Sequence, residues 1–107
     1  MNKTELVHRF QMIVMGELDA ANIDTTIPRQ HAFLDFIREG ANKLEFEANS
    51  KLIPKFEEDK MIGIAEGNLR MFVREAIREL ENSSKNTLDT TTIDIIRKRL
   101  CPLHPFC

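Results

Sequence analysis

Apolar residues recur at helical spacing in four separate segments of this chain, and no other feature of the sequence limits the fold as strongly. A spacing of about 3.6 residues places positions i, i+3, i+4 and i+7 on one side of a helix. The first segment, from about Thr4 to Asn22, has Asn2 or Thr4 as its cap. Its apolar side carries Leu6, Val7, Phe10, Ile13, Val14, Leu18 and Ala21. Glu17 lies inside the same arc, so we expect either fraying near Gly16 or a pair between Glu17 and a basic residue.

The second segment begins with one proline and ends before another. Pro28 suits a first helical position because its φ is fixed and it lacks an N–H, and Thr25 and Thr26 stand just upstream as caps. Pro54 disfavours the helical conformation in the residue before it, so we expect the helix to stop there. The apolar side carries Phe33, Phe36, Ile37, Ala41, Leu44 and Ala48.

The third segment, from about Glu57 to Glu81, is the most regular. Its apolar side carries Met61, Ile62, Ala65, Leu69, Phe72, Val73, Ala76, Ile77 and Leu80. Gly63 and Gly67 each lower the helix propensity by up to ~1 kcal/mol relative to alanine, and they leave room for close packing. The acidic run Glu57–Asp59 lies where the helix dipole favours negative charge, which accounts for it without a bound cation.

The fourth segment follows the polar linker NSSKN. Thr91 and Asp94 have the spacing of a helix start, and Pro102 prevents continuation beyond the helix. Its apolar positions are Ile93, Ile96 and Leu100. Since no run alternates apolar and polar residues as a strand does, the sequence predicts an all-α, small four-helix bundle-like domain. Three long helices, a shorter C-terminal helix and an extended tail over 101–107 form a single domain over 1–107.

Composition limits the partners and the compartment. The chain has 107 residues, of which 42% are hydrophobic and 30% charged, as expected of a folded domain. Its net charge of −2 gives no global basic field that would concentrate nucleic acid. The charged N-terminal segment lacks the apolar run of a signal peptide, and no segment has the length of a membrane span. We therefore expect a cytoplasmic protein with no membrane contact and with two reduced cysteines.

Signatures of catalysis and of cofactor binding are absent from the sequence. The chain contains no Tyr or Trp, its three histidines lie far apart, and it has neither a Gly-rich phosphate loop nor an H-E-x-x-H helix. We expect neither an enzymatic activity nor a cofactor.

An arginine ridge runs along the third segment. Arg70, Arg74 and Arg78 follow at i, i+4 and i+8, roughly opposite the apolar side. Such a ridge suits an acidic helix of another protein or a row of phosphates. The simpler interpretation, which we favour for the ridge alone, is a solvated face with pairs from Glu66 to Arg70 and from Glu75 to Arg78.

A second basic cluster lies in the fourth segment. Arg97, Lys98 and Arg99 are consecutive, so they point in three directions and form no single ridge. Basic residues near a helix C-terminus also fit the helix dipole. A helix-turn-helix that binds DNA through the third or fourth helix is the alternative, and the acidic total disfavours it.

Apolar residues outside the predicted core stripes point to an interface. They occur in three segments and are Met12, Met15, Phe46, Ile64 and Met71. One such residue carries little weight, because folded surfaces are largely apolar. Five of them indicate either a homodimer or an adaptable surface for another protein.

The chain closes with CPLHPFC. Cys101, His104 and Cys107 have the spacing of zinc ligands, but structural zinc requires four ligands and this motif has three. A disulfide between the two cysteines and a docking peptide for a partner are further interpretations. The interpretation we prefer is a terminal plug, in which Leu103, Phe106 and Cys107 fold back over the end of the bundle.

These observations predict a function class without naming a partner. We expect a small non-enzymatic regulator or adaptor that binds another protein and forms a homodimer: an anti-activator, an immunity-type inhibitor or a chaperone-like adaptor. The alternative is a small DNA-binding transcriptional regulator. The predicted partner-binding residues are Arg70, Arg74, Arg78, Phe46, Met71, Met12 and Met15.

Overall fold

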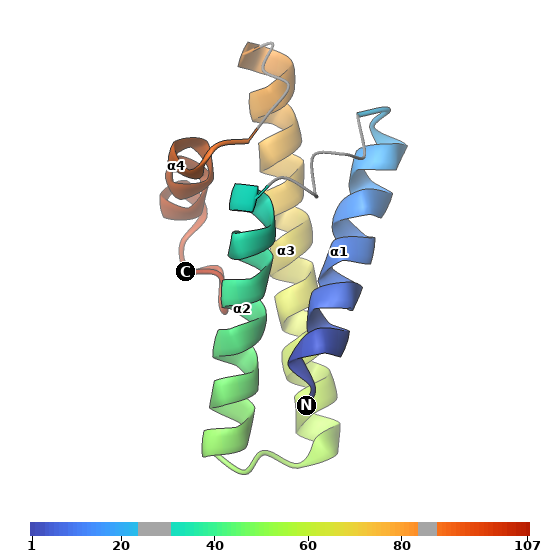
Figure 1. Cartoon of the computed structure of the whole chain (residues 1–107), viewed down its shortest axis with the longest axis vertical. Coiled ribbons are helices and arrows are strands. Elements are labelled where there is room, and N and C mark those ends of the chain that lie inside the picture. Colours follow the sequence, from blue (N-terminus) through green and yellow to red (C-terminus); the bar gives the residue numbers. More distant parts are fainter. Residues whose placement is uncertain (24–30, 84–87) are drawn as a thin grey trace.

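A computed structural model describes residues 1–23, 31–83 and 88–107. These residues form helices α1 (Lys3–Ala20), α2 (His31–Ser50), α3 (Lys55–Ser83) and α4 (Thr90–Leu100), with no strand among them (Figure 1). The predicted all-α domain with three long helices and one short one is confirmed.

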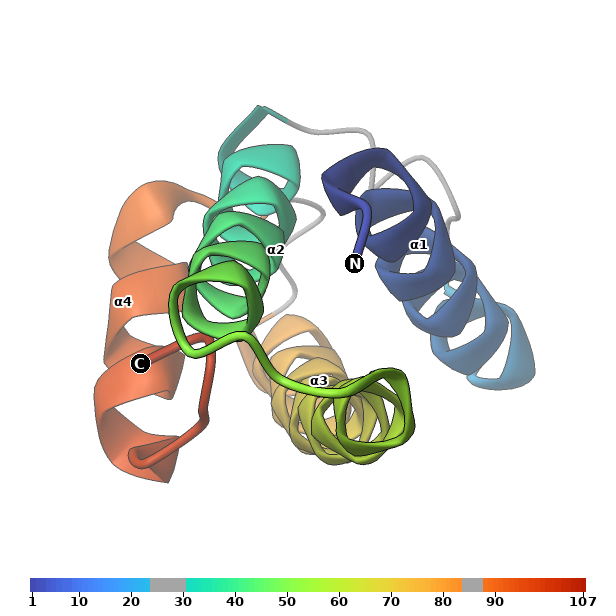
Figure 2. The same ribbon diagram turned by 90° about the horizontal axis from the view of Figure 1, so that it is seen from below.

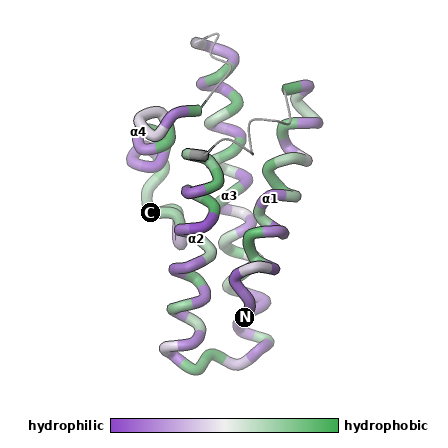
Figure 3. Tube along the Cα trace, viewed as in Figure 1, coloured by the Kyte–Doolittle hydropathy of each residue, from purple (hydrophilic) through white to green (hydrophobic). Residues whose placement is uncertain are grey.

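The three long helices run along the long axis of a molecule that measures 45 × 24 × 20 Å. α1 and α3 both run upward in Figure 1, and α2 runs downward between them in the chain. α4 lies across the others, because Figure 1 views it nearly along its axis whereas Figure 2 shows it lengthwise beside α2. Helix-period alternation of hydrophobic and hydrophilic residues follows each long helix (Figure 3).

Side-chain caps fix two of the helix starts. The Asn2 side chain accepts hydrogen bonds from the backbone N–H groups of Thr4 and Glu5, at 2.8 and 3.3 Å, as one of the two predicted caps for α1. α4 is capped by Asp89, whose carboxylate accepts from the Thr92 N–H at 2.7 Å. The predicted start at Thr91 is therefore wrong by two residues, because the nearer carboxylate supplies the cap.

Other predicted boundaries differ by a few residues. α3 begins at Lys55, immediately after Pro54, because proline can precede a helix that it cannot continue. α2 ends at Ser50, before that proline, as expected. The predicted start of α2 at Pro28, its caps Thr25 and Thr26, and most of the linker NSSKN lie outside the described residues.

The core is built from the four predicted apolar stripes and from the tail after α4. Its fully buried large side chains are Phe10, Phe33, Phe36, Phe72, Leu6, Leu18, Ile37, Leu44, Leu69, Ile96, Leu103 and Val14. The aromatic rings form one connected cluster around Phe36, which stacks on Phe72 at a centroid distance of 4.1 Å and on Phe106 at 4.9 Å. Phe33 meets Phe36 edge to face, and Phe10 meets Phe106 in the same way. Such pairs contribute ~0.5 to 1.5 kcal/mol beyond their buried area.

The tail after α4 plugs the side of the bundle. Leu103 and Phe106 are buried, as predicted, and the Phe106 N–H donates to the Leu103 carbonyl across a turn. Cys107 is exposed, so its predicted place in the plug is wrong. The plug also sits midway along the helices instead of over their end, because the Phe106 ring reaches Gly40 in the middle of α2.

Only one glycine in the described residues makes a close approach of the kind predicted for Gly63 and Gly67. A Cβ on Gly40 would collide with the Phe106 ring, whereas nothing lies within 4 Å of where a Cβ would stand at Gly16, Gly63 or Gly67. The expectation that Gly63 and Gly67 serve close packing inside the fold is therefore wrong. Gly40 allows the close packing instead, because the Phe106 ring of the tail occupies the space that a side chain would fill.

We predict opposite effects from alanine at two helical glycines. Gly40→Ala should lower the free energy of unfolding by roughly 1 to 3 kcal/mol, because the Phe106 ring is held between other rings and cannot yield freely. The matched control Gly16→Ala should raise it by up to ~1 kcal/mol, because the added methyl meets no neighbour and favours the helix. Urea denaturation measures both. Equal stabilisation by the two substitutions would show that the tail does not dock against α2.

Candidate functional site

A groove with a volume of about 700 Å³ runs between the parallel helices α1 and α3. Its α1 wall and floor are formed by His8, Arg9, Met12, Ile13, Gly16, Glu17 and Ala20. Its α3 wall is formed by Glu66, Arg70 and Arg74. The groove joins the apolar side chains of α1 to Arg70 and Arg74, which lie at least 50 positions further along the sequence.

Small residues on α1 keep the groove open. Gly16 has no side chain and its Cβ position is empty, and Ala20 lies one turn further along. Met12 stands one turn before Gly16 and keeps 56% of its surface exposed, while Ile13 is half-buried against the core. A thioether side chain beside an empty site can adjust to different apolar guests.

Two ion pairs bridge the groove from one helix to the other. Arg74 of α3 donates to Glu17 of α1, with a closest N–O distance of 3.3 Å. Arg9 of α1 donates to Glu66 of α3 at 3.0 Å. The predicted pairing of Glu17 with a basic residue is confirmed, and the alternative of fraying near Gly16 is wrong because α1 continues to Ala20.

The competition for Glu66 leaves one arginine of the groove unpaired. The predicted pair between Glu66 and Arg70 does not form, because Arg9 reaches the same carboxylate from α1. Arg70 is exposed and has no ion pair with any residue in the described ranges. Three arginines against two glutamates give the groove a net charge of +1 with histidine neutral, and the excess charge belongs to Arg70.

The structure brings together three of the predicted partner-binding residues, Met12, Arg70 and Arg74. The other four lie outside the groove. Met15 is half-buried, and Phe46 stands exposed on α2. Met71 is exposed on the outer side of α3, and Arg78 lies at the edge toward α1, where it lines a pocket with Glu17 and forms its predicted pair with Glu75 at 3.3 Å.

The basic residues of α4 hold that helix to its neighbours. Arg99 donates to Glu75 at 2.7 Å and to Glu79 at 2.9 Å, and these hydrogen bonds, with Glu79 the stronger influence, raise the pKa of the Arg99 guanidinium. The Arg97 guanidinium lies 5.1 Å from the centroid of the Phe36 ring. The sequence predicted only that these basic residues complement the dipole of their own helix. Their contacts with α2 and α3 were not predicted, because those contacts depend on how α4 crosses the bundle.

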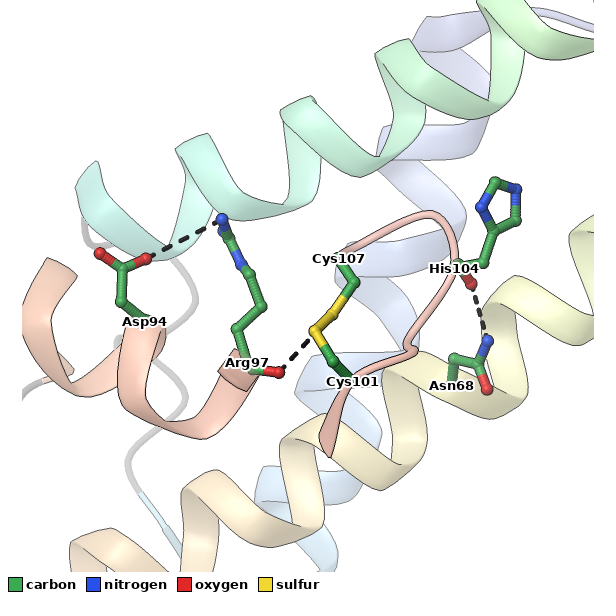
Figure 4. Close-up of a disulfide and its surroundings, with 6 residues drawn as sticks. All are labelled: Asn68, Asp94, Arg97, Cys101, His104 and Cys107. Carbon is green, nitrogen blue, oxygen red and sulfur yellow. Dashed lines mark hydrogen bonds and ion pairs between the residues drawn. A yellow bond between two sulfur atoms is a disulfide. The ribbon is translucent and has the colours of Figure 1, made fainter. Parts of the chain in front are cut away.

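The three residues with the spacing of zinc ligands, for which no metal site was predicted, are engaged in other contacts. Cys101 and Cys107 form a disulfide at the surface (Figure 4), so the expectation of reduced thiols is wrong. The His104 Nε2 lies 2.6 Å from a Glu47 oxygen, and the His104 carbonyl accepts from Asn68 at 2.7 Å. Within residues 1–23, 31–83 and 88–107, no three His, Cys, Asp or Glu side chains are grouped to hold a metal ion.

Comparison of the chain with protein-family models, with curated proteins and with solved structures finds no match. None of the helices in the described part of the chain has both the length and the apolar character needed to cross a membrane.

We predict that the disulfide stabilises the fold by closing the tail loop. Reduction should lower the free energy of unfolding by about 2 kcal/mol, the chain-entropy expectation for a loop of about seven residues. Urea denaturation with and without a phosphine reductant measures the difference. The Cys101→Ser, Cys107→Ser double variant serves as the control and should not respond to the reductant. Titration of two free thiols in the native, air-oxidised protein would contradict the prediction.

Proposed function

We propose that this protein is a small non-enzymatic regulator or adaptor that binds another protein through the groove between α1 and α3. The occupant we propose is an acidic amphipathic helix of that protein. The observation that carries the proposal is the unpaired, exposed Arg70 beside the exposed Met12 in an open groove. The partner classes remain those of an anti-activator, an immunity-type inhibitor or a chaperone-like adaptor.

The shape of the groove suits a helix. Two parallel helices flank it, and a third helix laid along them could place apolar side chains at i, i+4 and i+7 against Met12, Ile13 and Gly16. The empty Cβ position at Gly16 offers space for one inserted side chain. Burying such an anchor in a desolvated pocket is how most protein interfaces gain their binding energy.

The charge of the groove favours an acidic occupant. A carboxylate from the partner would pair with Arg70, and a second could compete for Arg74, whose bond to Glu17 is long and exposed. Exposed pairs of this kind contribute only ~0.2 to 1 kcal/mol, so the exchange costs little. Electrostatic complementarity would then select the partner and speed its association more than it would tighten the complex.

DNA binding is the weaker candidate. Arg97 and Arg99 are engaged by Phe36, Glu75 and Glu79, and Arg78 is paired as well. Only Arg70 among the ridge arginines has no ion pair in the described ranges, and one free guanidinium is far from the basic stripe that phosphate binding requires.

The compartment stays a prediction. The expected cytoplasmic location is disfavoured by the Cys101–Cys107 disulfide, because disulfides are commoner in oxidising compartments. A homodimer is also proposed, and it uses a different face of α3.

Affinity purification with the tagged full chain tests the groove. Met12→Glu, Arg70→Glu removes the apolar anchor and reverses the free charge, so it should weaken capture of a stoichiometric partner about tenfold or more. The matched control Phe46→Glu, Lys43→Glu makes the same kinds of change on α2 and should capture the partner as the unaltered chain does. Thermal unfolding of each variant checks that both remain folded. The captured protein should contain an acidic amphipathic helix that binds on its own as a peptide.

Two outcomes would contradict the proposal. One is loss of the partner in the α2 control with retention in the groove variant. The other is a gel shift with duplex DNA that weakens steeply with salt and disappears in Arg74→Glu, Arg78→Glu, which would favour the DNA-binding alternative.

A further inference from the structure

The outer side of α3 carries a repeat that the core does not use. The residues follow at steps of three or four, and at about 100° per residue they fall within an arc of about 80°. They are Glu57, Lys60, Ile64, Gly67, Met71, Glu75 and Arg78. We call this set the outer seam of α3. Such spacing is the pattern by which one helix pairs along its length with another.

The apolar centre of the outer seam is uncovered. Ile64 is 62% exposed and Met71 is 53% exposed, and nothing lies within 4 Å of a Cβ position at Gly67 between them. Figure 2, which looks along the bundle, shows no other helix on the side of α3 that faces away from α2. α1 borders one flank of the seam, where its Glu17 pairs with Arg74 of α3. α4 borders the other flank, where its Arg99 pairs with Glu75 of α3.

We propose that the outer seam binds a second copy of this chain, with the two α3 helices antiparallel. A twofold axis between Gly67 and Asn68 pairs residues that lie equally far from that point. Ile64 then faces Met71 of the second copy, and each chain supplies both members, so the apolar contact occurs twice.

The charges of the seam match under the same symmetry. Lys60 faces Glu75 of the second copy, and Glu57 faces Arg78 of the second copy. Both pairs are attractive, and each occurs twice in the dimer. Glu75 and Arg78 also pair with each other within each chain at 3.3 Å, so the contacts between copies would extend an ion pair that is already formed. A parallel arrangement would set each charged residue beside its own copy, and like charges in facing positions repel. Charge complementarity therefore favours an antiparallel second copy over a parallel one.

The dimensions suit a weak, specific pair. From Glu57 to Arg78 the seam spans about 33 Å at 1.5 Å per residue, most of the 45 Å long axis. Gly67 at the symmetry axis lets the two backbones approach closely. Two central apolar side chains per copy form a small interface, so the dimer should exchange with monomer at micromolar concentration.

Sedimentation equilibrium with charge-reversal variants tests the seam. Glu57→Arg places two like-charged pairs in its homodimer, and so does Arg78→Glu, so each should raise the dimer dissociation constant about tenfold. An equimolar mixture should recover the original affinity, because Arg at position 57 of one variant faces Glu at position 78 of the other. The matched control Lys43→Glu reverses an exposed charge on α2 and should leave the constant unchanged.

Each remaining outcome overturns the proposal. A monomer of 12.4 kDa at high micromolar concentration excludes the dimer. A dimer whose dissociation constant is unchanged in both charge-reversal variants uses another face. An equimolar mixture of the two variants that does not regain the original affinity excludes the antiparallel register. Circular dichroism confirms that each variant stays helical. The proposal does not rest on the groove, since Met12→Glu, Arg70→Glu should dimerise normally whether or not a partner binds there.

Discussion

The ring of Phe36 is the point at which separate parts of this chain meet. Phe72 of α3 stacks on it at 4.1 Å, and Phe106 of the tail stacks on it at 4.9 Å. The Arg97 guanidinium of α4 lies 5.1 Å from its centroid. One side chain of α2 thus orients α3, α4 and the tail, and a large aromatic ring is suited to this because it offers wide apolar area with little conformational freedom.

That orientation decides which sides of α3 face outward. With Phe72 turned toward Phe36, Arg70 and Arg74 face α1 and line the groove, whereas Met71 points to the outer seam. The two proposed interfaces therefore lie on neighbouring flanks of one helix. Each combines an exposed methionine with arginine, a pairing of adaptable apolar contact and directional charge that is common at protein interfaces.

Much of the fold follows from the sequence because burial is periodic. The predicted stripes contain almost all of the buried residues, and the buried tail residues Leu103 and Phe106 were also expected. Contacts between elements were harder to predict. Glu66 had a partner one turn away in Arg70, but the packing of α1 brought Arg9 to it instead. Helical arithmetic gives the direction of a side chain and does not say which neighbour lies there. The cysteines were expected to be reduced and form a disulfide instead, because their spacing suits a thiol pair, a metal or a disulfide and does not choose among them.

The position of Phe106 has a consequence for biosynthesis. A ribosome makes α1, α2 and α3 first, and those helices can begin to associate as they emerge from the exit tunnel. Their shared aromatic cluster lacks one ring until the segment after α4 has emerged as well, and the space at Gly40 stays unfilled until then. During that interval the core of the nascent chain has an open flank beside Gly40.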